Sequence, residues 1–181
     1  MNLSKTSYTK GVTCEKYLWL SCNKPNEAEE SSNEAIFDNG KEVGELARGL
    51  FGDYTLIDYD LGFPGMIEET NKALKNNTKI ICEASFNYDG NFCSVDILKN
   101  DNDGVELYEV KSSTNSKNIF IDDISYQTWV VKKCGLNVKK SCIVYINNEY
   151  VKDGYLDLNK FFIIEDVTDS IDLINVEQNI N

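Results

Sequence analysis

The sequence contains no histidine among its 181 residues. This absence excludes Ser-His and Cys-His nucleophile pairs, a histidine general base and every zinc site that uses imidazole. Any acid–base or metal chemistry must therefore use Asp, Glu, Lys, Tyr or Cys. The sequence also lacks Gly-x-x-x-x-Gly-Lys and Gly-x-Gly-x-x-Gly segments, which excludes nucleotide-phosphate loops of those two types.

Long apolar runs are missing as well. One of the longest, residues 142–146, is too short to span a bilayer. The first residues contain no apolar stretch of the signal-peptide kind. We therefore expect no membrane association and a cytoplasmic location. The six cysteines form no Cys-x-x-Cys pair, so we expect reduced thiols that act mainly as small apolar residues.

Positive charge is scarce, because 18 basic residues oppose 30 acidic ones and the formal net charge is −12. Phosphate contacts need a positive face, so this balance argues against strong DNA binding. The single arginine, Arg48, leaves the chain almost without bidentate phosphate forks. Lysines do pair at Lys132–Lys133 and at Lys139–Lys140, where they either form a local basic strip or serve solubility alone.

The length suits one domain, and the order of elements predicts an α/β or α+β fold. Strand-like segments at residues 79–88, 91–98 and 104–111 are separated by turn signals, of which Asp89-Gly90 is the strongest. These segments predict an antiparallel meander. The expected parts are a helical N-terminal part (about 1–76), a core (about 79–147) and a C-terminal strand and helix (about 156–178).

A helix capped by Asp122 or Asp123 is expected to follow the meander and to end near Lys133, before a further strand at residues 136–145. This order predicts a central mixed sheet flanked by helices. An earlier helix, which ends near residue 51, contains Gly40 and Gly44. Because glycine costs stability inside a helix, the two glycines indicate close packing or a close approach to another group.

The two predicted turns fix which residues face each other across the meander. With Asp89-Gly90 as a two-residue loop, Glu83 lies opposite Asp96. With the next turn centred on residues 102–103, Asp96 lies opposite Glu109. Facing residues share one side of a sheet, so the three carboxylates are expected to form a row. Lys111 lies two residues beyond Glu109 and points to the same side.

Three facing carboxylates repel one another, and one lysine does not compensate them. A divalent cation would, and oxygen ligands favour Mg²⁺ or Mn²⁺. Such an ion activates a water and stabilises charge on phosphorus, with lysine orienting the water or helping to deprotonate it. The row therefore predicts metal-dependent phosphodiester hydrolysis. The alternative is an ordinary solvated strand face.

Three short segments carry a family resemblance: Ser94-Val95-Asp96-Ile97-Leu98, Leu107-Tyr108-Glu109-Val110-Lys111-Ser112-Ser113 and Tyr126-Gln127. Together they resemble the PD-(D/E)XK nuclease superfamily, in particular the RecB-like branch that includes the CRISPR-associated exonucleases. The chain is also similar to an uncharacterised bacterial family of that branch through residues 3–5, 14–20 and 40–47. The resemblance covers residues 3 to about 166.

The resemblance implies a restriction-endonuclease-like core and a role for each matching residue. Asp96 and Glu109 would bind the metal, with the Val110 carbonyl as a third ligand. Lys111 would serve the attacking water. Gln127 matches the glutamine of the Gln-x-x-x-Tyr motif on the helix after the catalytic strands.

Glu83 matches an acidic position on the preceding strand and is expected to face the metal. The branch often carries a metal-binding histidine on the early helix, where this chain has none. Glu45 is the candidate replacement, with Glu42 as a competitor and an ordinary exposed helix glutamate as the alternative. In this interpretation Gly40 and Gly44 let the helix approach the site.

The last motif is incomplete, because Val131 stands where its tyrosine is expected. Tyr126 or Trp129 could supply a base-stacking surface instead, beside Lys132 and Lys133, or either ring could belong to the core. Cys14 matches the first of four cysteines that hold an iron–sulfur cluster in the CRISPR-associated members. No cysteine follows Cys142, so we expect no cluster.

The sequence therefore predicts a metal-dependent nuclease, with nucleic acid, in particular DNA, as its partner. The competing class is a degenerate module that keeps the nuclease fold and binds nucleic acid or a protein without cutting. A third hypothesis is an acidic interaction protein whose carboxylates are solvated and bind no metal. A protein partner or a further domain could supply the missing positive charge.

Overall fold

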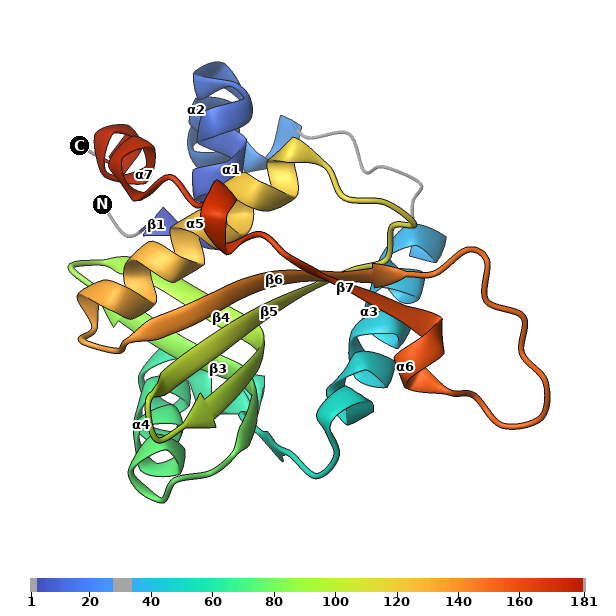
Figure 1. The fold of residues 1–181 in the computed structure, drawn as a ribbon. Helices are drawn as coiled ribbons and strands as arrows, with labels where there is room; N and C mark the ends of the chain where they lie inside the picture. Colours follow the sequence, from blue (N-terminus) through green and yellow to red (C-terminus); the bar gives the residue numbers. More distant parts are fainter. Residues whose placement is uncertain (1–2, 28–33, 181) are drawn as a thin grey trace.

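A mixed β-sheet forms the centre of the computed structural model, which describes residues 3–27 and 34–180 (Figure 1). The strand order is β2-β3-β4-β5-β6-β7, and β1 also pairs with β4, which makes seven strands in the described ranges. The strands are β1 (Leu3–Ser4), β2 (Thr55–Leu56), β3 (Ile80–Tyr88), β4 (Asn91–Asp101), β5 (Gly104–Lys111), β6 (Val138–Ile146) and β7 (Phe162–Asp166). The predicted mixed α/β architecture with an antiparallel meander is confirmed.

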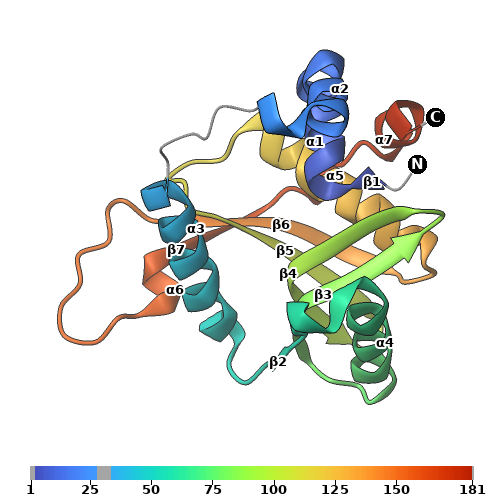
Figure 2. The ribbon, with the colours of Figure 1, turned by 180° about the vertical axis from the view of Figure 1, so that it is seen from behind.

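Helices cover both faces of the sheet (Figures 1 and 2). They are α1 (Lys5–Thr13), α2 (Glu15–Asn23), α3 (Glu34–Ala47), α4 (Gly62–Lys75), α5 (Asn118–Lys133), α6 (Leu158–Phe161) and α7 (Leu173–Ile180), with short 3₁₀ turns at Pro25–Glu27, Arg48–Phe51, Tyr59–Leu61 and Thr168–Ser170. Within the described ranges no helix has the length and apolar content that crossing a membrane requires.

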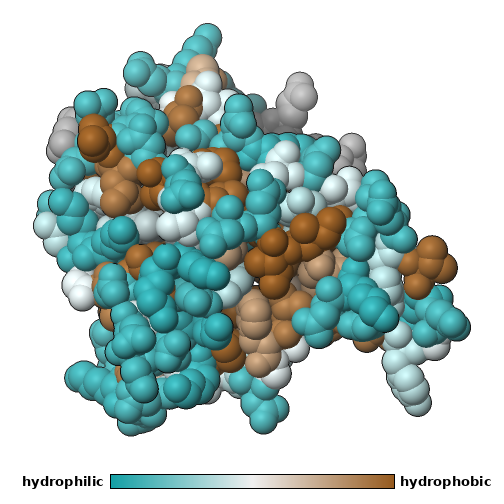
Figure 3. Space-filling view, in the orientation of Figure 1, coloured by the Kyte–Doolittle hydropathy of each residue, from teal (hydrophilic) through white to brown (hydrophobic). Residues whose placement is uncertain are grey.

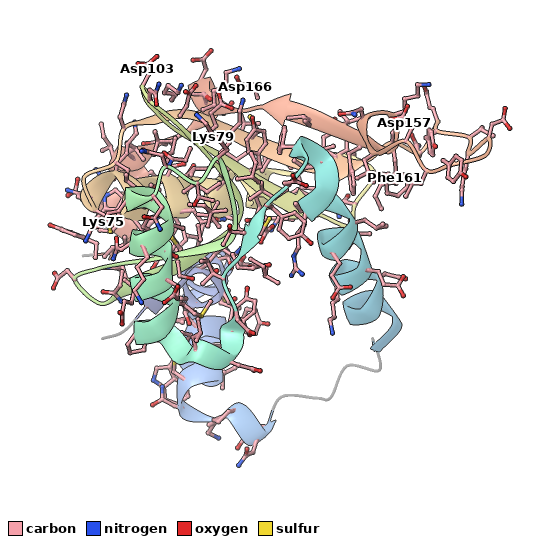
Figure 4. The ribbon with its side chains drawn as sticks, turned by 90° about the horizontal axis from the view of Figure 1, so that it is seen from below. Lys75, Lys79, Asp103, Asp157, Phe161 and Asp166 are labelled. Atoms are coloured by element: carbon pink, nitrogen blue, oxygen red, sulfur yellow. The ribbon has the colours of Figure 1, made fainter. Side chains whose placement is uncertain are left out.

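Two apolar clusters divide the core between the faces. On one face, α1 and α5 pack on the sheet through Tyr8, Tyr126 and Trp129. On the other face, α3 and the turn after it pack through Val43 and Ala47 among others. Phe161 of α6 lies beside α3 (Figure 4) and joins this second cluster.

The outer surface is mostly hydrophilic, as the high charge content requires. Within this hydrophilic surface, Figure 3 shows an apolar patch over β7. Ile163 and Ile164 of that strand are partly exposed there.

The helix after the meander begins earlier than predicted. It starts at Asn118, and its N-cap residue, Lys117, makes no side-chain capping bond. Asp122 and Asp123 therefore lie inside the helix, so the predicted cap is wrong. The physical reason is that the Asp123 carboxylate pairs with the Lys111 ammonium and does not accept a hydrogen bond from a backbone amide at the helix terminus.

Both predicted registers hold, but the sheet divides at the predicted carboxylate row. The pairs Cys82↔Ile97 and Ala84↔Val95 bracket Glu83 and Asp96, which do not pair with each other. On the other side of β4, pairing with β5 begins at Ile97↔Tyr108, so Asp96 does not pair with Glu109 either.

Beyond Ile97 and Tyr108, β4 and β5 separate, as Figure 2 shows. β1 takes the place beside β4 that β5 has left, and there Leu3 pairs with Asn91 and Ser4 with Phe92. Asp96 lies in the interval between the two partners. We call this interval the fork.

A backbone kink accompanies the fork. Glu83 has a φ of 59°, in the left-handed region that costs an L-residue roughly 1–2 kcal/mol. Its carbonyl oxygen accepts hydrogen bonds from the hydroxyls of Ser85 (3.0 Å) and Ser94 (3.1 Å). The apolar alternation changes face across this residue, because Cys82 packs with the α3 cluster and Ala84 with the α1–α5 cluster.

Helix α4 holds β3 just beyond the kink. The Ser85 amide donates a 2.9 Å hydrogen bond to the Thr70 hydroxyl, and that hydroxyl donates to the Met66 carbonyl. Both Thr70 and Ser85 are buried. Since a buried amide needs an acceptor, Thr70 replaces a neighbouring strand at this position.

Thr70→Val removes this acceptor at nearly constant side-chain volume. We expect the free energy of unfolding to fall by about 1–3 kcal/mol, the cost of an unpaired buried amide, in urea denaturation followed by circular dichroism. Thr55→Val on the exposed strand β2 is the control, with an expected change within ~0.5 kcal/mol. Equal losses in both variants would contradict the assigned role of Thr70.

Candidate active site

A cavity of about 520 Å³ opens at the fork, between the sheet and α3. Its sheet side is acidic and its helix side is basic and rich in glycine. The lining residues are Glu83, Asp96, Glu109 and Val110 from the sheet, Gly40, Lys41, Gly44 and Arg48 from α3 and the turn after it, and Tyr59. The volume lies within the ~300–1,000 Å³ that small-molecule sites enclose.

Asp96 bridges the fork. Its Oδ2 accepts a 2.7 Å hydrogen bond from the Val110 amide, where a strand carbonyl would otherwise be the acceptor. Burial raises the pKa of Asp96 to about 8, and the negative charge of Glu109 adds to the effect while Lys5 opposes it. Asp96 therefore keeps its proton to a higher pH than an exposed aspartate does.

Glu109 is 2% exposed and accepts four hydrogen bonds. Its Oε1 accepts from Lys5 (3.0 Å) and Lys111 (2.6 Å), and its Oε2 accepts from Lys5 (3.1 Å) and Gln127 (2.7 Å). Burial alone would raise the pKa of Glu109, but Lys5 and Lys111 outweigh it and hold that pKa well below its usual range. Glu109 is therefore ionised.

Lys111 and Gln127 meet Glu109 on the α5 side of the sheet. The Lys111 ammonium also contacts the Asp123 carboxylate and lies 5.3 Å from the centre of the Phe120 ring. Burial lowers the pKa of Lys111, but Glu109 and Asp123 raise it further, so the group stays protonated. The Gln127 amide donates to both carboxylates, with 3.2 Å to Asp123 Oδ1.

Glu83 belongs to the opposite end of the cavity. The Tyr59 hydroxyl donates to its Oε2 at 2.5 Å, and Arg48 Nη2 donates to its Oε1 at 3.3 Å. Burial raises the pKa of Tyr59, and the hydrogen bond to Glu83 raises it further. Arg48 therefore compensates Glu83, which lines the cavity as predicted but pairs with neither Asp96 nor Glu109.

The structure adds Lys5, Arg48 and Asp123, which the sequence pattern did not assign to the site. With the predicted Lys111, Lys5 and Arg48 supply three positive charges against four carboxylates, the fourth being Asp123. Asp123 carries a raised pKa, first because of burial and then because of Glu109. Residues 3–5 belong to the segments that carry the resemblance, but no local signal linked Lys5 to Glu109 or Asp123 to Lys111.

The donor chemistry of the cavity suits Mg²⁺ or Mn²⁺. Asp96, Glu109, Glu83 and Val110 offer oxygen atoms only, which hard divalent ions prefer. Within residues 3–27 and 34–180 no three acidic or cysteine side chains already stand in a metal-binding arrangement. A cation would therefore have to share Glu109 with its lysine partners.

Glu45 lies away from the cavity. Its side chain is exposed, as is that of Glu42, and neither lines the cavity. Helix α3 instead presents the face that carries Gly40, Gly44 and Arg48. A Cβ at Gly44 would meet nothing within 4 Å, so close packing does not explain this glycine.

The residues expected to stack or contact nucleic acid are not brought to the cavity. Tyr126 is fully buried, stacks on Tyr8 at 4.7 Å between ring centres and donates to the Leu3 carbonyl at 2.8 Å. Trp129 is 5% exposed, so neither ring has a face open to a base. Both belong to the core, which was the stated alternative.

Lys132 and Lys133 are exposed in the last turn of α5. Lys133 pairs there with Glu177 at 2.9 Å. All six cysteines are free thiols: Cys82, Cys93 and Cys142 are buried, as expected for small apolar residues, whereas Cys14, Cys22 and Cys134 are exposed.

Comparison with known proteins adds little to this picture. No family model matches the chain, and no curated protein matches it. A solved structure described as "Crystal structure of SSO0001" is 13% identical, with a TM-score of 0.46, and the match covers 99% of this chain and 74% of that one. A likeness at this level carries no argument about function.

Asp96→Asn tests the protonation of the fork residue. Because its pKa is higher in the folded chain than in the unfolded chain, the native protein loses stability as pH rises from about 4 towards about 8. The asparagine variant keeps the acceptor for Val110 and has no such loss. The melting temperature of the variant minus that of the native chain should therefore be larger at pH 9 than at pH 6.

Asp153→Asn, in an exposed loop, is the control and should show no pH-dependent difference from the native chain. A constant gap between Asp96→Asn and native melting temperatures from pH 6 to pH 9 would contradict the raised pKa.

Proposed function

We propose that this protein is a nuclease that hydrolyses phosphodiester bonds of nucleic acid, with DNA as the expected substrate, by means of Mg²⁺ or Mn²⁺. One observation carries the proposal: Asp96 and Glu109 converge on one cavity at the fork, with the Lys111 ammonium 2.6 Å from Glu109. The resemblance to the PD-(D/E)XK superfamily, with its restriction-endonuclease-like core, assigns catalysis to the same three residues. A cytoplasmic location is part of the proposal.

Asp96 and Glu109, with the Val110 carbonyl, would hold the cation. When bound, such an ion lowers the pKa of a water ligand and stabilises negative charge on the phosphoryl group. Lys111 remains protonated, so it orients the water and stabilises charge and does not accept a proton. Gln127 holds Glu109 in place through the 2.7 Å hydrogen bond from its amide to Oε2.

The helix side of the cavity supports the same substrate class. Lys41 lines the cavity together with the carboxylates, and a phosphate oxygen there would find its positive charge. Arg48 also lines the cavity but already pairs with Glu83 at 3.3 Å. Gly40 and Gly44 leave room on this side, so a phosphodiester would lie against α3, with the cation at Asp96 and Glu109.

A second candidate function is a non-catalytic binding module of the same fold. The observation that favours it is that both oxygens of Glu109 already accept hydrogen bonds from lysine or glutamine. Arg48 likewise compensates Glu83. A site compensated in this way is stable without a metal ion.

Cleavage of labelled single- and double-stranded DNA, and of RNA, distinguishes the two functions. With Mg²⁺ or Mn²⁺ we expect cleavage by the native chain and none with EDTA. Asp96→Asn, Glu109→Gln and Lys111→Met should each lower the rate at least ~100-fold. Glu45→Gln is the matched control, because Glu45 lies outside the cavity, and it should retain native activity.

Cleavage that survives in all three variants, or that EDTA leaves intact, would overturn the proposal. A folded native chain that neither cuts nucleic acid nor binds Mn²⁺ in calorimetry would favour the module instead.

A further inference from the structure

Lys5 reaches the fork although it is far from the meander in sequence. It is the first residue of α1, directly after β1, and the Ser4 hydroxyl caps the helix by accepting from the Ser7 amide at 3.2 Å. The Leu3 amide donates to the Gly90 carbonyl at 2.9 Å. β1 and the helix cap together fix the starting point of the Lys5 side chain.

The Lys5 ammonium spans the whole carboxylate of Glu109. It lies 3.0 Å from Oε1, 3.1 Å from Oε2 and 3.9 Å from Asp123 Oδ1. Its side chain is 24% exposed, so water reaches it only in part. One positive charge equidistant from both oxygens is also how a cation binds a carboxylate in bidentate fashion.

Lys5 and Lys111 share the carboxylates of Glu109 and Asp123. Lys111 lies 2.6 Å from Glu109 Oε1, also contacts Asp123 and is the residue that the proposed chemistry uses, whereas Lys5 takes both oxygens of Glu109. Two ammonium groups on one carboxylate repel each other, and both would repel any further cation. Lys5 therefore stands in competition with a divalent ion for Glu109.

We propose that Lys5 is a positioning residue that occupies one cation position on Glu109 and thereby weakens divalent-metal binding in the absence of substrate. This inference rests on the proposed function, because it takes Asp96 and Glu109 as the metal ligands. An incoming ion must displace the ammonium or share Glu109 with it. A phosphodiester brings negative charge that offsets this cost, so metal and substrate bind with positive coupling.

Calorimetric titration with Mn²⁺ tests the inference without any cleavage. Lys5→Met removes the charge, and we expect Mn²⁺ to bind at least ~10-fold more tightly than to the native chain. Lys5→Arg keeps the charge and should restore weak binding. Lys16→Met, an exposed lysine of α2, is the matched control and should bind as the native chain does. Loss of Mn²⁺ binding in Asp96→Asn would show that the measured ion binds at the cavity.

Native or weaker Mn²⁺ affinity in Lys5→Met, with native binding that requires Asp96, would overturn the inference and leave the proposed function standing. Absence of Asp96-dependent binding in every variant would overturn the proposed function, and the inference with it. Binding by Lys5→Met alone would support the inference most directly.

A measurement on the native chain covers the case in which Lys5→Met does not fold. In a chain with ¹⁵N-labelled lysine side chains, Mg²⁺ should shift the Lys5 Nζ resonance in a saturable way and leave that of Lys16 unchanged. Lys5→Arg assigns the resonance. A Lys5 signal that stays constant while Mg²⁺ binds at Asp96 would overturn the inference.

Discussion

The hydrogen bond from the Val110 amide to the Asp96 carboxylate is the constraint on which the site depends. At this point β4 and β5 have stopped pairing, and the half-buried Val110 amide would be left without a strand acceptor. A side chain replaces a main-chain carbonyl, so the strands stand farther apart than the ~4.8 Å of a regular ladder. The cavity between the sheet and α3 opens at this separation, and Glu109 lines it.

Charge compensation is the second organising principle. Carboxylates gathered in a low-dielectric interior are stable only when each has a partner. The protein divides the task by position: Arg48 serves Glu83 at one end, and Lys5 and Lys111 serve Glu109 at the other. Asp96 lies between them, and its raised pKa favours the protonated form. The carboxylates therefore differ in their tendency to ionise, although the sequence pattern treats them alike.

The sequence predicted the strands and their registers because local signals determine them. Asp89-Gly90 supplies the positive φ angles of a tight hairpin, and both residues adopt them. The charge partners depend instead on how distant helices dock, and no spacing rule brings Lys5 to Glu109. The rotation of α3 about its axis likewise depends on docking, and it places Glu45 outside the cavity. The i, i+4 spacing of Gly40, Gly44 and Arg48 is the signal that marks the inward face.

The attachment of Lys5 makes the site depend on the packing of a helix that does not line the cavity. Lys5 and Glu109 are 104 residues apart in the chain, and Lys5 is carried to the fork by the ladder of β1 on β4 and by α1, whose buried Tyr8 stacks on Tyr126 of α5. The charge balance of Glu109 is therefore complete only once α1 and α5 have packed on the sheet. The local sequence of the meander supplies the carboxylates, and tertiary structure supplies their electrostatic state.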